Sequence, residues 1–341
     1  MRLSSTYAIF IVISGWCSAA GVAPYHVINK ISVPGEGGWD VLTVDAQSRR
    51  LYVSHSTQVE IIDIDQNKSI GQILDTPGVH DIALAPELER GFTSNGREDK
   101  VSIFDLKSNT VLTKVEVNGK NPDIVIYDSA SQRIFTFNGK SSDTTAIDAS
   151  TGKVVGHLSL DGKPEFAVVD GRGTVFVNLE DKNMLESFDS KTLKMKARWT
   201  LSPCEEPSAL AIDIQNNRLF AGCGNKIMVV VDAGSGHVIT TLPIGDHVDG
   251  AVFNPNTQEI FFSNGDGTLT VIHEDSPNTF HVSDTVKTQV GARTLALDNK
   301  TNRLYLPTAE FGSTPAPTAD HPHPRPTILP GTFTILVVAQ S

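Results

Sequence analysis

The chain has 341 residues, with 28 lysines and arginines against 39 aspartates and glutamates, and its formal net charge is −11. Phosphate backbones repel so acidic a chain, and no basic patch offsets the repulsion, so we expect no nucleic-acid partner. Beyond the N-terminal segment no apolar run is long enough to span a membrane. The composition is that of a soluble protein, which we expect to be a monomer.

The N-terminus has the features of a secretory signal. Arg2 supplies a positive charge, residues 3–15 form an uncharged apolar stretch, and Ser18, Ala19 and Ala20 offer small residues at a cleavage site. We predict a signal peptide over residues 1–23, cleaved near Ala20 or Ala23. Residues 24–341 are then a single domain that is periplasmic or secreted.

One sequence motif recurs seven times after this segment, at intervals of 40 to 44 residues. The motif consists of an apolar run, a short polar turn and a second apolar run that begins with an aromatic residue. The aromatics are Tyr52, Phe92, Phe135, Phe176, Phe220, Phe261 and Tyr305. A period of this length with four short strands per unit is typical of a β-propeller blade. We predict an all-β fold, a seven-bladed β-propeller with four antiparallel strands per blade.

The first copy shows the predicted strands well, over residues 41–45, 51–54, 59–63 and 69–73. The third strand ends in an aspartate in five copies, and we expect these residues to shape the following turn. They are Asp63, Asp105, Asp148, Asp189 and Asp232, which become His273 and Val337 in the last two copies.

The seventh copy lacks a fourth strand, because the sequence ends after the third. Residues 26–33 closely echo residues 237–244, a fourth strand of the fifth copy. We therefore predict that the N-terminal strand joins the last blade and closes the ring, which removes an open sheet edge.

The motif Leu51-Tyr52-Val53-Ser54, followed by residues 59–63 and a turn, resembles the YVTN-type repeat of exported bacterial propellers, the YncE-like family. Residues 92–95 and 220–223 are looser copies. The resemblance covers essentially the whole mature chain and implies an exported seven-bladed propeller without a defined activity. YVTN repeats also resemble those of seven-bladed lactonases, a more distant similarity that leaves an enzyme open.

A candidate site lies where the inner strands begin, because these positions meet around the central channel. Alignment of the copies places six charged residues there: Asp40, His80, Asp123, Glu165, Asp249 and Arg293. The fifth copy has Ser208 at this position. Crowded carboxylates raise one another's pKa unless a cation offsets them. We predict a ligand-binding channel mouth where arginine or a divalent metal supplies that charge; a merely polar, water-filled mouth is the alternative.

Loops on the same face add a rim, which we predict to contain Trp39, His55, Glu205, Glu206 and His247. Cys204 and Cys223 lie within one blade on this face, and two cysteines in an exported chain favour a disulfide over a metal pair. Asn–Gly pairs after the second strands, such as Asn95-Gly96, are expected to serve left-handed backbone turns.

The seventh copy carries one large insertion, residues 310–331, with six prolines and with His321 and His323. Proline density predicts an extended, stiff segment with few internal hydrogen bonds, placed over the candidate face as a rim or partial lid. A metal site at the two histidines, a docking strand for a partner and a passive insertion are all open.

Two functions are the main candidates from the sequence, and a third, a redox partner, ranks behind them because without haem-attachment cysteines it could only dock onto another carrier. The first is a binding or scaffolding protein that recognises a protein, a peptide or a small ligand on the face of the between-blade loops. The second is a lactonase-like hydrolase, in which mouth carboxylates with His80 or His247 act as general bases or metal ligands. No nucleophile elbow or HExxH motif supports the enzyme, and we assign no cofactor beyond the divalent metal named above.

Overall fold

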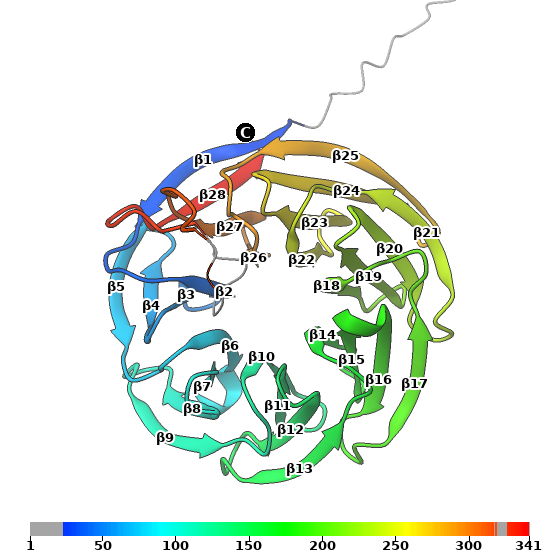
Figure 1. Cartoon of the computed structure of the whole chain (residues 1–341), viewed down its shortest axis with the longest axis horizontal. Coiled ribbons are helices and arrows are strands. Elements are labelled where there is room, and N and C mark those ends of the chain that lie inside the picture. Colours follow the sequence, from blue (N-terminus) through cyan, green and yellow to red (C-terminus); the bar gives the residue numbers. More distant parts are fainter. Residues whose placement is uncertain (1–22, 317, 319–325, 341) are drawn as a thin grey trace, which may run out of the picture.

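Seven four-stranded antiparallel sheets form a closed ring in the computed structural model (Figure 1). The structure describes residues 23–316, 318 and 326–340. The signal-peptide prediction, apart from its last residue, therefore lies outside the described residues. Within them, no helix is long and apolar enough to cross a membrane. The predicted fold class, a seven-bladed propeller, is confirmed.

In each of the first four blades the strands follow one another along the chain from the innermost to the outermost. Blade one contains β2 (Trp39–Asp45), β3 (Arg50–His55), β4 (Gln58–Asp63) and β5 (Lys68–Ile73). Blade two contains β6 (Val79–Ala85), β7 (Arg90–Asn95), β8 (Lys100–Asp105) and β9 (Val111–Glu116), with a short 3-10 turn, η1 (Pro86–Leu88). Blade three contains β10 (Pro122–Asp128), β11 (Arg133–Asn138), β12 (Asp143–Asp148) and β13 (Val154–Ser159). Blade four contains β14 (Pro164–Val169), β15 (Thr174–Leu179), η2 (Glu180–Lys182), β16 (Met184–Asp189) and β17 (Met195–Thr200).

The remaining blades follow the same order. Blade five contains β18 (Pro207–Asp213), β19 (Arg218–Cys223), β20 (Ile227–Asp232) and β21 (Val238–Pro243). Blade six contains β22 (Val248–Asn254), β23 (Glu259–Asn264), β24 (Thr268–Ser276) and β25 (Thr279–Lys287). Blade seven contains β26 (Ala296–Asp298), β27 (Arg303–Thr308), β28 (Thr334–Gln340) and the N-terminal β1 (Tyr25–Ser32).

The ring is closed by β1, as the sequence predicts. This strand pairs antiparallel with β28, from Tyr25 opposite Gln340 to Ser32 opposite Thr334. Tyr25 also contacts blade six, because its hydroxyl donates a 2.6 Å hydrogen bond to Glu259 and its ring packs edge-on against Phe261. The strand therefore completes one sheet and holds it against the next.

The hydrophobic core lies between the blades. The recurring aromatics of the second strands are buried, and most core clusters combine side chains of two adjacent sheets. The recurring aspartates accept hydrogen bonds from the backbone of the next turn, as Asp63 does from Asp65 and Gln66. The turn role that the sequence predicts is confirmed.

A second recurring contact was not predicted. Arginines that open the second strands donate to backbone carbonyls of the following blade: Arg50 to Leu106, Arg90 to Ala149, Arg133 to Ser190 and Arg218 to Pro277. Each of these hydrogen bonds joins two adjacent sheets, and the bonds recur at the same level of the ring. These arginines pair with the last residues of the inner strands, such as Arg50 with Asp45, so they join the blades at the end of the ring opposite the start of the inner strands.

Candidate functional site

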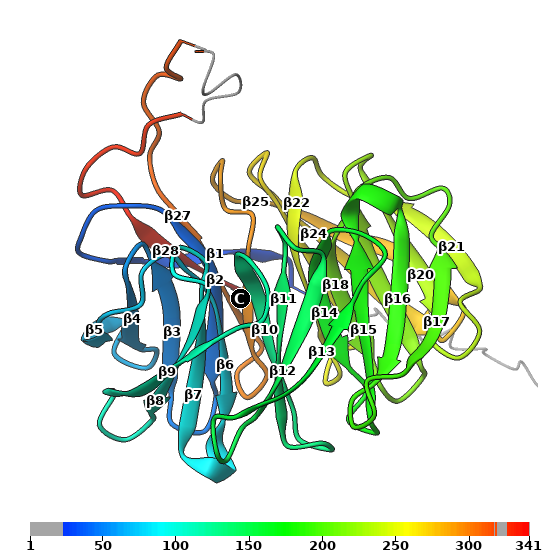
Figure 2. The same cartoon turned by 60° about the horizontal axis from the view of Figure 1, so that its bottom comes forward.

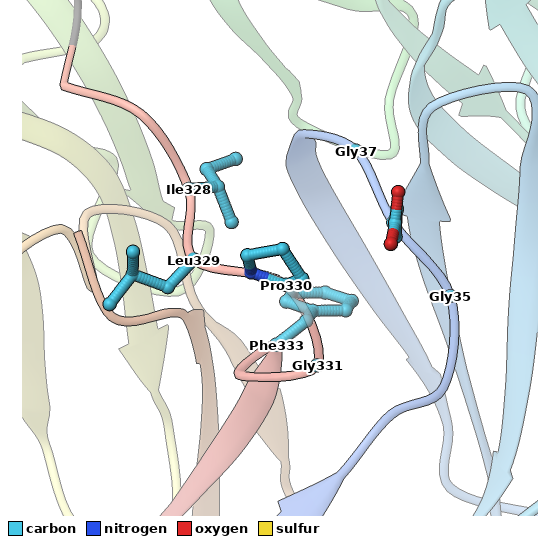
Figure 3. Close-up of a pocket in the computed structure, with 8 residues that line it drawn as sticks. Gly35, Gly37, Ile328, Leu329, Pro330, Gly331 and Phe333 are labelled. Carbon is cyan, nitrogen blue, oxygen red and sulfur yellow. The ribbon is translucent and has the colours of Figure 1, made fainter. Parts of the chain in front are cut away.

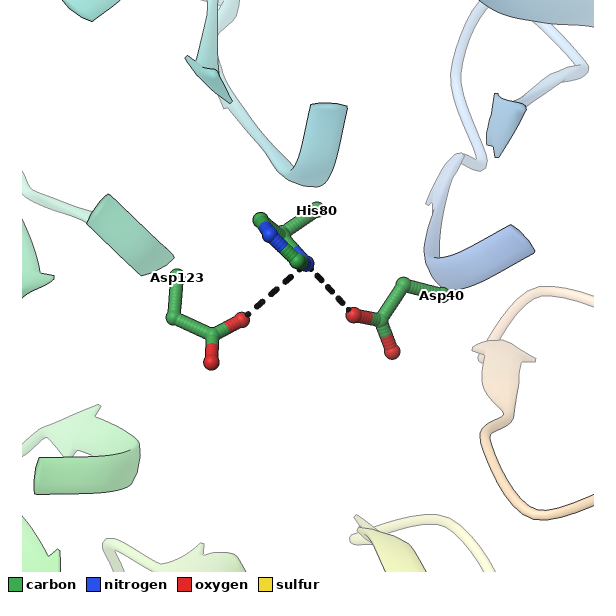
Figure 4. A group of neighbouring side chains, drawn as sticks. All are labelled: Asp40, His80 and Asp123. Carbon is green, nitrogen blue, oxygen red and sulfur yellow. Dashed lines mark hydrogen bonds and ion pairs between the residues drawn. The ribbon is translucent and has the colours of Figure 1, made fainter. Parts of the chain in front are cut away.

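An alternating series of charges runs around the channel mouth over five adjacent blades. Asp249 lies 2.5 Å from Arg293, which also reaches Asp40 at 3.4 Å. Asp40 in turn lies 2.8 Å from Nδ1 of His80, and the same nitrogen lies 3.4 Å from Asp123 (Figure 4). We call these five residues the mouth arc. It contains five of the six mouth residues that the sequence singled out.

Local backbone geometry directs these side chains toward the axis. Asp40, His80, Asp123 and Asp249 are each the second residue of an inner strand. In each case the pairing register shifts just after the first residue, and such bulges turn a side chain away from its regular direction. Arg293 differs, since β26 begins only at Ala296 and Arg293 lies in the preceding turn.

Hydroxyl groups lock the backbone of the mouth arc. The Asp40 amide donates to Ser54 at 2.9 Å, and the Asp40 carbonyl accepts from Thr294 of the previous blade at 2.6 Å. Ser94 donates in the same way to the Asp123 carbonyl. The arc is thus preorganised by bonds between neighbouring blades, and these serines and threonines were not singled out from the sequence.

Glu165 and Ser208 occupy the equivalent positions of blades four and five, outside the arc. Glu165 pairs with Lys163 at 2.6 Å, and Lys163 also contacts Glu180. Burial raises the pKa of Glu165 to about 8, although Lys163 opposes the change. Ser208 donates to the carbonyl of Val248 at 2.7 Å. Blade five therefore leaves an uncharged gap in the ring.

Burial and mutual repulsion shift the protonation of the arc. Burial raises the pKa of Asp249 to about 7; Arg293 opposes this rise, and the charge of Asp40 adds to it. Burial lowers the pKa of His80, but its hydrogen bond to Asp40 and the charge of Asp123 outweigh that effect and raise it overall. Burial also raises the pKa of Asp123. Buried carboxylates of this kind are frequent at functional sites.

A cavity of about 950 Å³ opens beside the arc, on the side of the uncharged gap. Its polar lining includes Asp249, Arg293, Ser208 and Glu206. Its apolar lining includes Trp39, Val248, Val290, Phe311, Pro326 and Ile328. Volume and lining match small-molecule and peptide sites, which combine apolar walls with a few polar groups.

The insertion forms one wall of this cavity. Figure 2 shows it rising from the end of β27 above the face that carries the between-blade loops. Phe311 and Ile328 form an antiparallel bridge, and Gly312 donates to the Thr327 carbonyl at 2.8 Å. The two ends therefore hydrogen-bond to each other, so the prediction of few internal hydrogen bonds is wrong for this part. His321 and His323 lie outside the described residues.

Aromatic side chains anchor the insertion to the first blade. Trp39 stacks on Phe333 with ring centroids 5.0 Å apart and lies 6.1 Å from Phe311. A second cavity, of about 190 Å³, lies between residues 35–37 and residues 328–331 (Figure 3). His55 lies beneath this cluster, with its ring 4.6 Å from Phe333 and only 1% of its surface exposed. The structure therefore corrects its placement on the rim.

The other rim residues lie at the surface. Cys204 and Cys223 form a disulfide, and the amide of Gly224 donates to the carbonyl of Glu205 at 2.8 Å. The cross-linked loop presents Glu206 to the cavity, whereas Glu205 is exposed and does not line it. His247 also lines the cavity, with 79% of its side chain exposed.

The Asn–Gly pairs have a different role from the predicted one. Asn95 and Asn138 are buried, and their amides donate across to the third strand, to Ser102 at 2.7 Å and to Asp143 at 2.5 Å. Gly96 does not have a positive φ; a Cβ at this position would lie 2.7 Å from Nε2 of His80. The glycine is needed because the imidazole packs against it, so the left-handed explanation is wrong.

Comparisons with known proteins identify the fold. No family model matches the chain, and no curated protein matches it. A chain of the solved structure titled "Crystal Structure of Mitotic Checkpoint Complex" is similar, with a TM-score of 0.73 and 13% identity over 89% of this chain and 95% of that one. At this identity the similarity establishes the propeller architecture and not a specific activity.

Proposed function

We propose that the protein is an exported binding protein that holds a small molecule or a peptide in the cavity beside the mouth arc. The observation that carries the proposal is the cavity itself, where residues of blade one, of blades four to seven and of the base of the insertion surround about 950 Å³. Binding needs a rigid frame with a few fixed polar groups, and the interblade bonds behind the arc supply it.

The polar lining favours a ligand with a positive group. Arg293 is already shared between Asp249 and Asp40. Glu206 lines the cavity and has no cation within ion-pair distance in the described part of the chain. A ligand with an ammonium or guanidinium group fits this lining: the cation would pair with Glu206, and the apolar part would pack against Phe311 and Ile328.

Adjacent glutamates give a matched test. A thermal-shift screen of amines and short basic peptides should yield ligands that stabilise the wild-type protein. Glu206→Gln should weaken their binding more than tenfold, since a charged hydrogen bond contributes about 1.5–3 kcal/mol and about 1.4 kcal/mol is a factor of ten. Glu205→Gln should change nothing, because Glu205 does not line the cavity. Equal loss in both variants, or in neither, would contradict the proposal.

A lactonase-like hydrolase remains the second candidate. It is favoured by Asp249, a carboxyl group that lines the cavity beside Arg293 and whose pKa burial raises to about 7. Such a group suits general base catalysis near neutral pH. Turnover of a γ- or δ-lactone, lost in Asp249→Asn and kept in Asp266→Asn, would support the enzyme; no turnover above buffer would exclude these substrates.

We also propose that the protein is exported and that it belongs to the YncE-like family. The N-terminal sequence supports a signal peptide, and the Cys204–Cys223 disulfide supports an oxidising compartment. Residues 51–54 form most of β3, which supports membership in the YncE-like, YVTN-repeat group. N-terminal sequencing of the exported protein should find a start at Gly21 or Pro24. Light scattering should find a monomer.

A further inference from the structure

Three potential metal-ligand atoms converge at the channel mouth from three adjacent blades. Oδ2 of Asp40, Nδ1 of His80 and Oδ1 of Asp123 come from β2, β6 and β10, and suitable donor atoms of the three residues all lie within 4.8 Å of one another. Figure 4 shows both carboxylates directed at the same ring nitrogen. Donor atoms around one bound ion at about 2.0–2.2 Å lie at comparable mutual distances.

The donors are held in place before any ion arrives. Asp40 is fixed through its amide and its carbonyl by Ser54 and Thr294, and the Asp123 carbonyl accepts from Ser94. The imidazole packs against Gly96, where a Cβ would lie 2.7 Å from Nε2 of His80. An ion therefore meets a prepared set of ligands and does not have to order three flexible side chains.

The local charge leaves room for a cation. Arg293 is shared between Asp249 and Asp40, and Lys163 is shared between Glu165 and Glu180. Within the described residues, Asp123 has His80 as its only ion-pair partner. A further carboxylate, Asp81, is buried behind His80 and accepts hydrogen bonds from Ile82 and Val125. Negative charge thus exceeds fixed positive charge on this side of the mouth.

We propose that Asp40, His80 and Asp123 bind one divalent transition-metal ion of the zinc class. One imidazole with two carboxylates is a mixed nitrogen and oxygen donor set, which suits zinc better than the all-oxygen sites of calcium. Three protein ligands leave a fourth position open, and the partial exposure of all three side chains places that position toward the channel. The site goes beyond the proposed function, because the ion can bind whether or not the neighbouring cavity holds a ligand.

Calorimetry with zinc chloride tests the proposal at pH 7.5, on full-length mature protein without a His-tag that has been stripped with a chelator and dialysed. We expect one ion per chain. His80→Gln and Asp123→Asn should each weaken binding at least tenfold. Cobalt(II) should bind with the same stoichiometry and give the visible absorption of a four-coordinate site, which both variants lose.

Other histidines provide the controls. His273 and His281 face each other on β24 and β25, with His281 2.7 Å from Asp275, and His321 with His323 forms a second pair in the sequence. His281→Gln and the double change His321→Gln, His323→Gln should leave the stoichiometry at one. Zinc binding that survives His80→Gln and Asp123→Asn, or that disappears in a control, would overturn the proposal.

Absence of stoichiometric binding to the wild-type protein would also overturn it. Circular dichroism of each metal-free variant should match the wild type. If His80→Gln fails to fold, the nearly isosteric Asp123→Asn decides the result alone. A failed zinc titration leaves the cavity hypothesis intact, since that hypothesis is tested by the Glu206 and Glu205 pair.

Discussion

Replacement of Glu274 by glutamine should stabilise the protein in alkaline solution and not in acid. The side chain of Glu274 lies on β24 between blades, with 4% of the residue exposed. Oε1 accepts a 3.1 Å hydrogen bond from Asn216, whereas Oε2 has no partner among the described residues. Burial, followed by the charge of Asp213, raises the pKa of Glu274 from 4.5 to about 7.

The sign follows from proton binding. Between pH 4.5 and about 7 the folded state keeps a proton on Glu274 that the unfolded state has lost. The proton on Glu274 therefore stabilises the folded state fully below pH 4.5, and this stabilisation is lost as the pH rises from 4.5 to about 7. At about 1.4 kcal/mol per pH unit, the loss amounts to about 3 kcal/mol. Glutamine carries no charge at either pH and keeps the acceptor for Asn216.

Scanning calorimetry at pH 4.5 and pH 8.5 measures the effect. We expect Glu274→Gln to equal the wild type at pH 4.5 and to unfold about 6 °C higher at pH 8.5, given about 2 °C per kcal/mol for large domains. Glu116→Gln is the control, because 84% of the Glu116 side chain is exposed. A Glu274→Gln effect of equal size at both pH values, or a lower melting temperature at pH 8.5, would refute the reasoning.

Three further changes test the frame of the site. Cys204→Ser with Cys223→Ser should cost about 3 kcal/mol by urea titration, because the bond closes a loop across 19 residues; a loss below 1 kcal/mol would contradict this. Asn138→Ala should cost about 2–3 kcal/mol in the same assay, since it removes the amide that donates to Oδ1 of the buried Asp143. Deletion of residues 24–32 should expose the edge of β28 and produce oligomers by light scattering, whereas a stable monomer would show that closure is dispensable.

The architecture could be predicted because it depends on features that repeat. Each copy must bury its second-strand aromatic against a neighbour, so a period of 40 to 44 residues is visible without a structure. The echo between residues 26–33 and 237–244 located the closing strand. The same register placed Asp40, His80, Asp123 and Asp249 at the mouth, since all four stand at the start of an inner strand.

The errors occurred where contacts join residues far apart in the chain. His55 was expected on the rim, but β3 continues through it and Phe333 covers its ring. Phe333 stands two positions after the insertion, and no local pattern connects it to blade one. Gly96 was misread for a related reason: His80, which requires the small residue, stands in another strand of the blade. The pairing of Arg293 with Asp249 and Asp40 likewise depends on how side chains from different blades meet around the axis.

The closing strand has a consequence for the order of events in folding. Among the described strands β1 is synthesised first and its partner β28 last, and Thr334 bonds to Ile31 across 303 positions of the chain. Joining two segments so far apart costs about 5 kcal/mol in chain entropy, so this contact should form after the local blades. Until then the six complete blades form an open arc, which closes only when β1 pairs with β28.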